Sequence, residues 1–233
     1  MGYSIVAYAL DLDALRIRIQ AKDPALLDSV RKQVEAQTEN FEEYLEAAND
    51  PEPPSGPGFF GRLFGKKAPE PAPAPQEPIT GMDAMRHLLF DEPKNPDAWT
   101  AYGYLFEIVC EVHGTRLFAR GFESIRSSSG WVGIVDKALA KHLGSKSSFR
   151  LEETFLARGL PLNGLPEADD FPYCGYLEAN EAKALAAALR EIDLDQVAAA
   201  TGHPAPGREA MNGLVEMVEE CENSGRAVVT FYY

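Results

Sequence analysis

Apolar and polar residues recur along this chain with a helical period over most of its length and with a strand-like pattern at its two ends. Residues 3–10 form a run of strand-forming side chains that no charge interrupts, and residues 227–233 form a second such run. Uncharged apolar runs of this length are typical of buried strands. We expect the two strands to pair in a small sheet with helices packed over it.

Between these strands, apolar residues recur at intervals of three and four, as on the buried face of an amphipathic helix. Asp11 is expected to cap a short helix that ends at Gln20. Asp23, followed by Pro24, begins a second helix, which the pattern extends to Asn49. Further helices are predicted at residues 82–89, 95–113, 130–143, 149–158, 179–191, 193–201 and 208–224. Residues 115–128 fit a strand or a helix, and residues 160–176 predict an ordered loop packed on the body.

One segment breaks this pattern. Residues 51–78 hold nine of the 17 prolines of the chain, and a segment so poor in backbone donors favours a polyproline-II-like excursion over a core. Because the two terminal strands are expected to pair in one sheet, we interpret residues 50–79 as an insertion within a single domain. Residues 1–49 and 80–233 then form one α+β domain, mostly helical, around the small sheet.

Composition limits the classes of partner. The chain has 22 basic and 36 acidic residues, a formal net charge of −14, which disfavours nucleic acid and favours cationic partners. Three widely spaced cysteines form no Cys-x-x-Cys pair, a usage typical of a reducing compartment. The first residues are a poor secretion signal, and no apolar run approaches the length of a membrane span, so a cytoplasmic location is expected.

Motifs for catalysis are missing from the sequence. It has no Gly-x-Ser-x-Gly elbow, no phosphate-binding loop and no histidines at metal-ligand spacing. His113 and His142 each end a predicted helix, where an imidazolium interacts well with the helix dipole. We therefore predict no catalytic residue, no cofactor and no metal site.

Carboxylates and aromatic rings are densest in the loop at residues 167–176. Adjacent aspartates commonly accept backbone hydrogen bonds in turns, but they also suit a binding surface or an acid–base pair. All three interpretations stay open. The candidate residues here are Asp169, Asp170, Phe171, Tyr173 and Tyr176.

A basic, aromatic segment lies inside the proline-rich insertion. As a helix it would gather four apolar side chains on one face, with its cations outside that face. Docking into the groove of a partner protein, contact with an anionic membrane, and folding back on the parent domain all remain alternatives. The candidate residues here are Phe59, Phe60, Arg62, Leu63, Phe64, Lys66 and Lys67.

Several short motifs together resemble an uncharacterised bacterial family, common in actinobacteria, that is classed as a domain of unknown function. They include the opening Gly2-Tyr3-Ser4, Met85 to Phe90, Arg158 to Pro161, Asp169 to Leu177 and the closing Val229 to Tyr233. The resemblance covers most of the chain outside residues 50–79. It implies an architecture but no catalytic residues.

The function that these observations favour is a cytoplasmic protein-binding module, such as an acidic inhibitor or immunity-type partner of a basic target. Its contacts would lie in the 160–177 loop and in Phe59–Lys67. One alternative is a small-molecule-processing enzyme with Asp169, Asp170 and Tyr173 in a pocket. Another is a scaffold that the Phe59–Lys67 segment recruits to a membrane or a partner.

Overall fold

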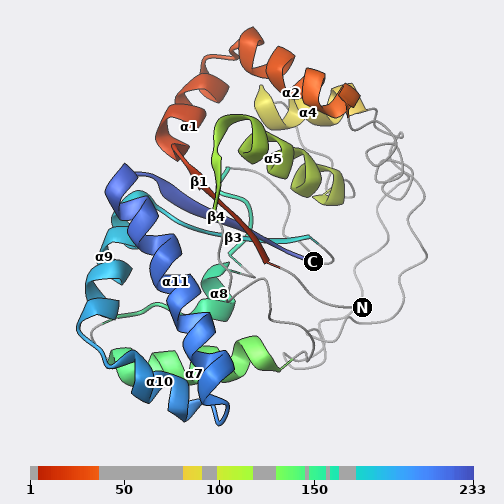
Figure 1. Cartoon of the computed structure of the whole chain (residues 1–233). Helices are drawn as coiled ribbons and strands as arrows, with labels where there is room; N and C mark the ends of the chain where they lie inside the picture. Colours follow the sequence, from red (N-terminus) through yellow and green to blue (C-terminus); the bar gives the residue numbers. More distant parts are fainter. Residues whose placement is uncertain are drawn as a thin grey trace, which may run out of the picture.

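A computed structural model describes residues 5–36, 81–90, 99–117, 130–144, 147–155, 158–162 and 172–233. Within these ranges the chain is mostly helical, with one antiparallel sheet (Figure 1). The elements are β1 (Ile5–Leu10), α1 (Leu12–Gln20), α2 (Pro24–Ala36), α4 (Gly81–Leu89), α5 (Trp99–His113), β2 (Thr115–Leu117), α7 (Trp131–Leu143), α8 (Leu151–Phe155), β3 (Tyr173–Leu177), α9 (Ala179–Arg190), α10 (Leu194–Ala200), α11 (Pro204–Ser224) and β4 (Ala227–Tyr232).

The two ends of the chain meet in the middle of the sheet. Its strand order is β2-β1-β4-β3, and β1 pairs antiparallel with β4 along its whole length, from Ile5 opposite Tyr232 to Leu10 opposite Ala227. The predicted pairing of the terminal strands is therefore confirmed, as is the α+β class. β2 and β3 form the two edges of the sheet.

Helices cover both faces of the sheet, and each face has its own core (Figure 1). Alternate side chains of β1 point to opposite faces, as the pleat requires. Tyr8 and Leu10 join the core under α1, α2, α4 and α5, whereas Ala7 and Ala9 join the core under α7 to α11. The termini therefore form the middle layer of a three-layer molecule.

The first two helices begin where the capping residues predict. The Asp11 carboxylate accepts a hydrogen bond from the backbone N–H of Ala14 at 2.9 Å, and the Asp23 carboxylate accepts one from Ala25 at 2.9 Å. Both bonds satisfy backbone donors that have no partner inside the helix. The predicted extension of the second helix to Asn49 lies outside the described residues beyond Ala36, as does the insertion at 50–79.

The prediction of a loop at residues 160–176 is wrong at its end, because Tyr173–Leu177 is strand β3. Gly175 and the flanking turn formers concealed it. A Cβ at Gly175 would lie 2.4 Å from Cα of Phe155 in α8, so only glycine allows the strand to lie against that helix. The Thr230 hydroxyl also links α8 to β3, because it donates to the carbonyls of Phe155 (2.8 Å) and Gly175 (3.2 Å).

Two helix boundaries also differ from the predictions. α8 spans Leu151–Phe155, shorter than the predicted 149–158, and Arg158 lies in a bend before Gly159, whose φ is +85°. α11 begins at Pro204, earlier than the predicted start after Gly207, because proline suits the first turn of a helix. Its end is as predicted, with Gly225 in the left-handed conformation at φ +66°.

Candidate functional site

Only part of the site predicted from sequence falls within the described residues. Asp169, Asp170, Phe171 and all of Phe59–Lys67 lie outside them, so their proposed roles stay predictions. Tyr173 and Tyr176 lie in β3 three residues apart and therefore point to opposite faces of the sheet.

Each of these two tyrosines already has an aromatic or cationic neighbour. The Tyr173 ring stacks on Tyr232, with 6.4 Å between the ring centroids. The Arg158 guanidinium lies 4.1 Å above the Tyr176 ring and forms a salt bridge with Glu181. A cation over an aromatic face is attracted by the ring's electron density. These contacts join β3 to α9 and to the bend at Arg158.

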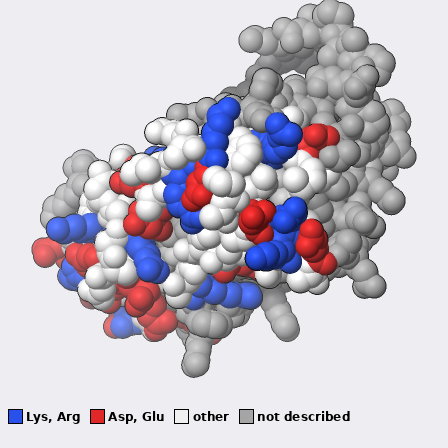
Figure 2. Space-filling model, turned by 90° about the horizontal axis from the view of Figure 1, so that it is seen from above, with Lys and Arg blue, Asp and Glu red and all other residues white. Residues whose placement is uncertain are grey.

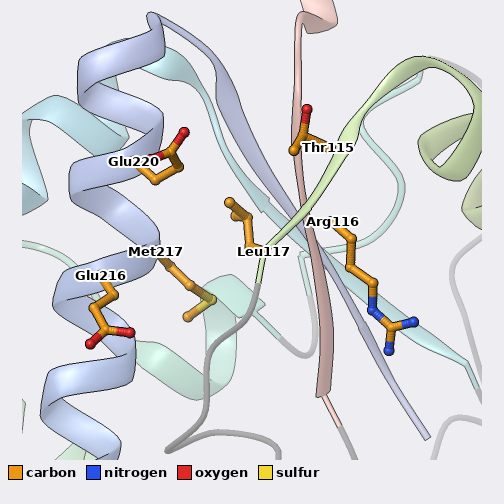
Figure 3. A pocket seen from close by; sticks show the side chains of 6 residues that line it. All are labelled: Thr115, Arg116, Leu117, Glu216, Met217 and Glu220. Carbon is orange, nitrogen blue, oxygen red and sulfur yellow. The ribbon is translucent and has the colours of Figure 1, made fainter.

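A hollow of about 250 Å³ opens at the opposite edge of the sheet, between β2 and α11 (Figure 3). We call it the edge hollow. Leu117 and Met217 lie between strand and helix, and Arg116 is turned to the other side of the strand. The residues that line the edge hollow are Thr115, Arg116, Leu117, Glu216, Met217 and Glu220.

The edge hollow combines an apolar floor with exposed carboxylates. Leu117 and Met217 are buried, whereas Glu216 and Glu220 are exposed and lie one helical turn apart on α11. Neither glutamate has a salt bridge to any residue that the structure describes. Like charges at this spacing repel one another, so a cation near either carboxylate would relieve that repulsion.

Other acidic residues nearby are already neutralised by arginines. Arg190 forms salt bridges with Glu219 (3.2 Å) and Glu222, and Arg208 pairs with Asp195 at 2.7 Å. The face seen from the top of Figure 1 also shows basic and acidic side chains interspersed (Figure 2). Glu216 and Glu220, by contrast, form no salt bridge with a described residue, although Arg116 belongs to the same lining and Arg226 donates a hydrogen bond to Thr115.

A second pair of glutamates lies on the other side of β2. Glu107 on α5 accepts a hydrogen bond from the Tyr8 hydroxyl at 3.4 Å and another from the Tyr233 hydroxyl. Glu111, one turn later, also accepts from Tyr8 at 3.5 Å. Arg116 lies opposite Tyr8 in the strand register and faces the same side. We call Tyr8, Glu107, Glu111 and Tyr233 the carboxylate–tyrosine cluster.

Burial changes the titration of this cluster. Loss of solvent, and after it the charge of Glu111, raise the pKa of Glu107 from its ordinary 4.5 to about 7, although the Tyr8 hydrogen bond and Arg116 act to lower it. Burial and the same carboxylates also raise the pKa of Tyr8. Glu107 therefore changes its protonation state near neutral pH. Shifted pKa values of this kind occur at functional sites and also in structural networks.

A serine and a histidine lie close together but do not form a nucleophile–base pair. Nε2 of His113 is 3.0 Å from the Ser29 hydroxyl, and its Nδ1 faces the Arg18 guanidinium at 3.5 Å. Because Arg18 can only donate, Nδ1 accepts and Nε2 carries the proton. Ser29 in turn donates to the carbonyl of Leu26 at 2.7 Å. The histidine therefore donates to the serine, the reverse of what nucleophilic activation requires.

Burial and Arg18 lower the pKa of His113. The lowered pKa disfavours an imidazolium at this helix end. His142 has a plain structural role, since its Nδ1 lies 2.8 Å from the carbonyl of Ala138 one turn earlier.

Cysteine and metal chemistry find little support in the described ranges. Cys110, Cys174 and Cys221 are buried thiols, and burial raises the pKa of each, which keeps them protonated and unreactive. Among the described residues, no three side chains of His, Cys, Asp or Glu gather as metal ligands. No helix in the same ranges has the length and apolarity needed to cross a membrane.

Comparison with known proteins places the chain in a family. A family model described as a domain of unknown function, DUF7691, matches residues 1–233. The chain belongs to the DUF7691 family. No curated protein and no solved structure shows significant similarity to it. The resemblance to a domain-of-unknown-function family is thus confirmed, and the DUF7691 match gives no reaction or partner.

Sequence reasoning missed both glutamate pairs of this DUF7691 domain. A signal for the first was available, because Glu107 and Glu111 are one turn apart on the otherwise apolar helix Trp99–His113. In the sequence alone, Glu216 and Glu220 look like part of an ordinary solvent-exposed helix face, because nothing there shows that β2 lies beside α11. Only the tertiary structure distinguishes Glu216 and Glu220 from the paired acids around them.

Proposed function

We propose that this domain is a binding module that receives a basic segment of a partner protein in the edge hollow. The observation that carries the proposal is the pair Glu216 and Glu220, exposed above the apolar Leu117 and Met217 without a salt bridge among the described residues. An acidic inhibitor or immunity-type partner of a basic target, acting in the cytoplasm, fits this surface.

The lining suits lysine and arginine in particular. Both have a long aliphatic stem that packs on apolar surface and a charged head that stays near water. The stem would lie along Leu117 and Met217, and the head would lie near one of the two carboxylates. A net charge of −14 would also speed the approach of a basic partner at low ionic strength.

The position at a sheet edge adds a second mode of contact. Among the described strands, β2 pairs with β1 alone. An edge strand offers backbone donors and acceptors to an extended peptide, and this strand would present them beside the hollow. An extended basic segment could therefore use backbone and side-chain contacts together.

The test is a titration of the full chain, followed by amide NMR signals. The probe is a peptide of alternating lysine and leucine, and the matched control peptide has glutamate in place of lysine. We expect shifts at Thr115–Leu117 and around Glu216 and Glu220 with the lysine peptide alone. The double variant Glu216→Gln/Glu220→Gln should lose them.

Glu209→Gln supplies the matched control variant, because Glu209 is an exposed glutamate of the same helix that does not line the hollow. It should keep the response of the wild type. The proposal fails if the lysine peptide shifts signals elsewhere, or if Glu209→Gln weakens binding as much as the double variant does.

A further inference from the structure

Strand β3 forms the edge of the sheet opposite β2, and residues 158–162, which we call the strap, lie along it. The Gly159 N–H donates to the Cys174 carbonyl at 2.9 Å. Nη1 of Arg158 donates to the Tyr176 carbonyl at 3.0 Å. Cys174 and Tyr176 are two residues apart in β3, so both carbonyls point away from β4. The strap therefore occupies acceptors that a further strand would need in order to pair with β3.

Two arginines hold the strap, one at each end. Arg158 forms two hydrogen bonds with the Glu181 carboxylate, at 2.6 and 3.1 Å. Arg16 of α1 donates to the Pro161 carbonyl at 3.0 and 3.3 Å and to Glu178 at 2.6 Å. Glu178 and Glu181 lie together at the start of α9, where the Glu178 N–H donates to Glu181 at 2.8 Å. The strap is thus fastened to a helix end that is itself held by hydrogen bonds.

We propose that Arg16 and Arg158 are edge guards, which keep the strap on β3 and so prevent a second copy of this chain from pairing with that strand. Arg158 is exposed, so the guarded edge lies at the surface. All strand pairs of the sheet are antiparallel. Two β3 strands related by a two-fold axis would pair in the same way and join two sheets edge to edge.

The charge of the chain opposes such pairing and makes the guards testable. The formal net charge is −14, and loss of two arginines makes it more negative, which strengthens the repulsion between copies. Stronger self-association after loss of Arg16 and Arg158 would therefore arise from the opened edge and not from the change in charge. Pairing at β3 would also leave the edge hollow free, because β2 is the other edge of the sheet.

The test is sedimentation velocity of the full chain at several concentrations. Arg16→Ala/Arg158→Ala should self-associate at least about tenfold more strongly than the wild type, because the strap loses its hydrogen bonds to charged groups. The product should have twice the mass of the wild-type species and should dissociate on dilution. Arg158→Ala alone should change in the same direction by less.

The matched control is Arg190→Ala/Arg208→Ala, which changes the net charge equally. The salt bridges of these two arginines join helices α9, α10 and α11 and do not involve the strap. The control should behave as the wild type does. A strap variant that associates no more than the wild type, or a control that associates as strongly as the strap variant, would overturn the proposal.

A second measurement separates an opened edge from misfolding. Amide hydrogen exchange at a concentration too low for self-association reports the Gly159 N–H, which is bonded to the Cys174 carbonyl. Its exchange should be about tenfold faster in Arg16→Ala/Arg158→Ala and unchanged in the control. Unchanged exchange at Gly159 in the strap variant, or association into aggregates of many sizes, would overturn the proposal.

Discussion

Two pairs of glutamates, each one helical turn apart, lie on opposite sides of the short strand β2. Glu107 and Glu111 on α5 contact tyrosine hydroxyls, and Glu107 is half-buried. Glu216 and Glu220 on α11 are exposed above an apolar floor. The spacing is the same, but burial differs. Burial makes Glu107 of the first pair a structural and proton-sensitive residue, and exposure leaves the second pair available to a partner.

The largest expected difference between the pairs is in stability. Glu107→Ala leaves the Tyr233 hydroxyl without its acceptor and takes one acceptor from Tyr8, so the free energy of unfolding should fall by about 1–3 kcal/mol. Glu216→Ala removes an exposed side chain and should change it by less than about 0.5 kcal/mol. Urea denaturation of both variants at pH 6, a value below the raised pKa of Glu107, measures the difference. Equal losses of unfolding free energy in the two variants would contradict the expected difference between the pairs.

The second difference is in the pH dependence of stability. Because the folded-state pKa of Glu107 is raised to about 7, its stabilising contribution is complete below 4.5 and is lost as the pH rises through 7. The stability of the wild type relative to Glu107→Gln should therefore decline across that window. Denaturation midpoints of the two proteins at several pH values give the comparison. A constant difference would contradict the raised pKa.

The smallest expected effect concerns the exposed pair. Replacing Glu216 and Glu220 by glutamine relieves repulsion at i, i+4 and should raise the free energy of unfolding by about 0.2–0.5 kcal/mol in low salt. The gain should shrink at high salt, because salt screens exposed charges. Thermal denaturation at two salt concentrations checks this. A loss of stability would show that these side chains have structural partners.

Local signals in the sequence predicted much of the fold. Asp11, Asp23 and Gly225 mark helix boundaries through contacts within a few residues, and these positions are confirmed. The pairing of β1 with β4 could also be predicted, because each end of the chain has an uncharged run of strand-forming residues. What these predictions share is that each rests on a local pattern.

Features that depend on distant segments were missed. β3 could not be recognised from its own residues. The close approach of α8 leaves room only for glycine at position 175, and glycine weakens the strand pattern. The hydrogen bond from Tyr233 to Glu107 joins residues 126 positions apart. The edge hollow likewise exists only once β2 lies beside α11. In each case the chemistry arises from a contact that no short window of the sequence contains.

The most direct test of the account is to identify what touches the edge hollow in an extract of cells that produce this protein. A photo-crosslinking amino acid would replace Thr115, which is exposed and lines the hollow, and in a control protein it would replace Glu209, which is exposed but lies outside it. We predict that the Thr115 position captures a basic protein, and that Glu216→Lys/Glu220→Lys abolishes the capture. Capture that persists after this charge reversal, or that occurs equally at the Glu209 position, would contradict the account.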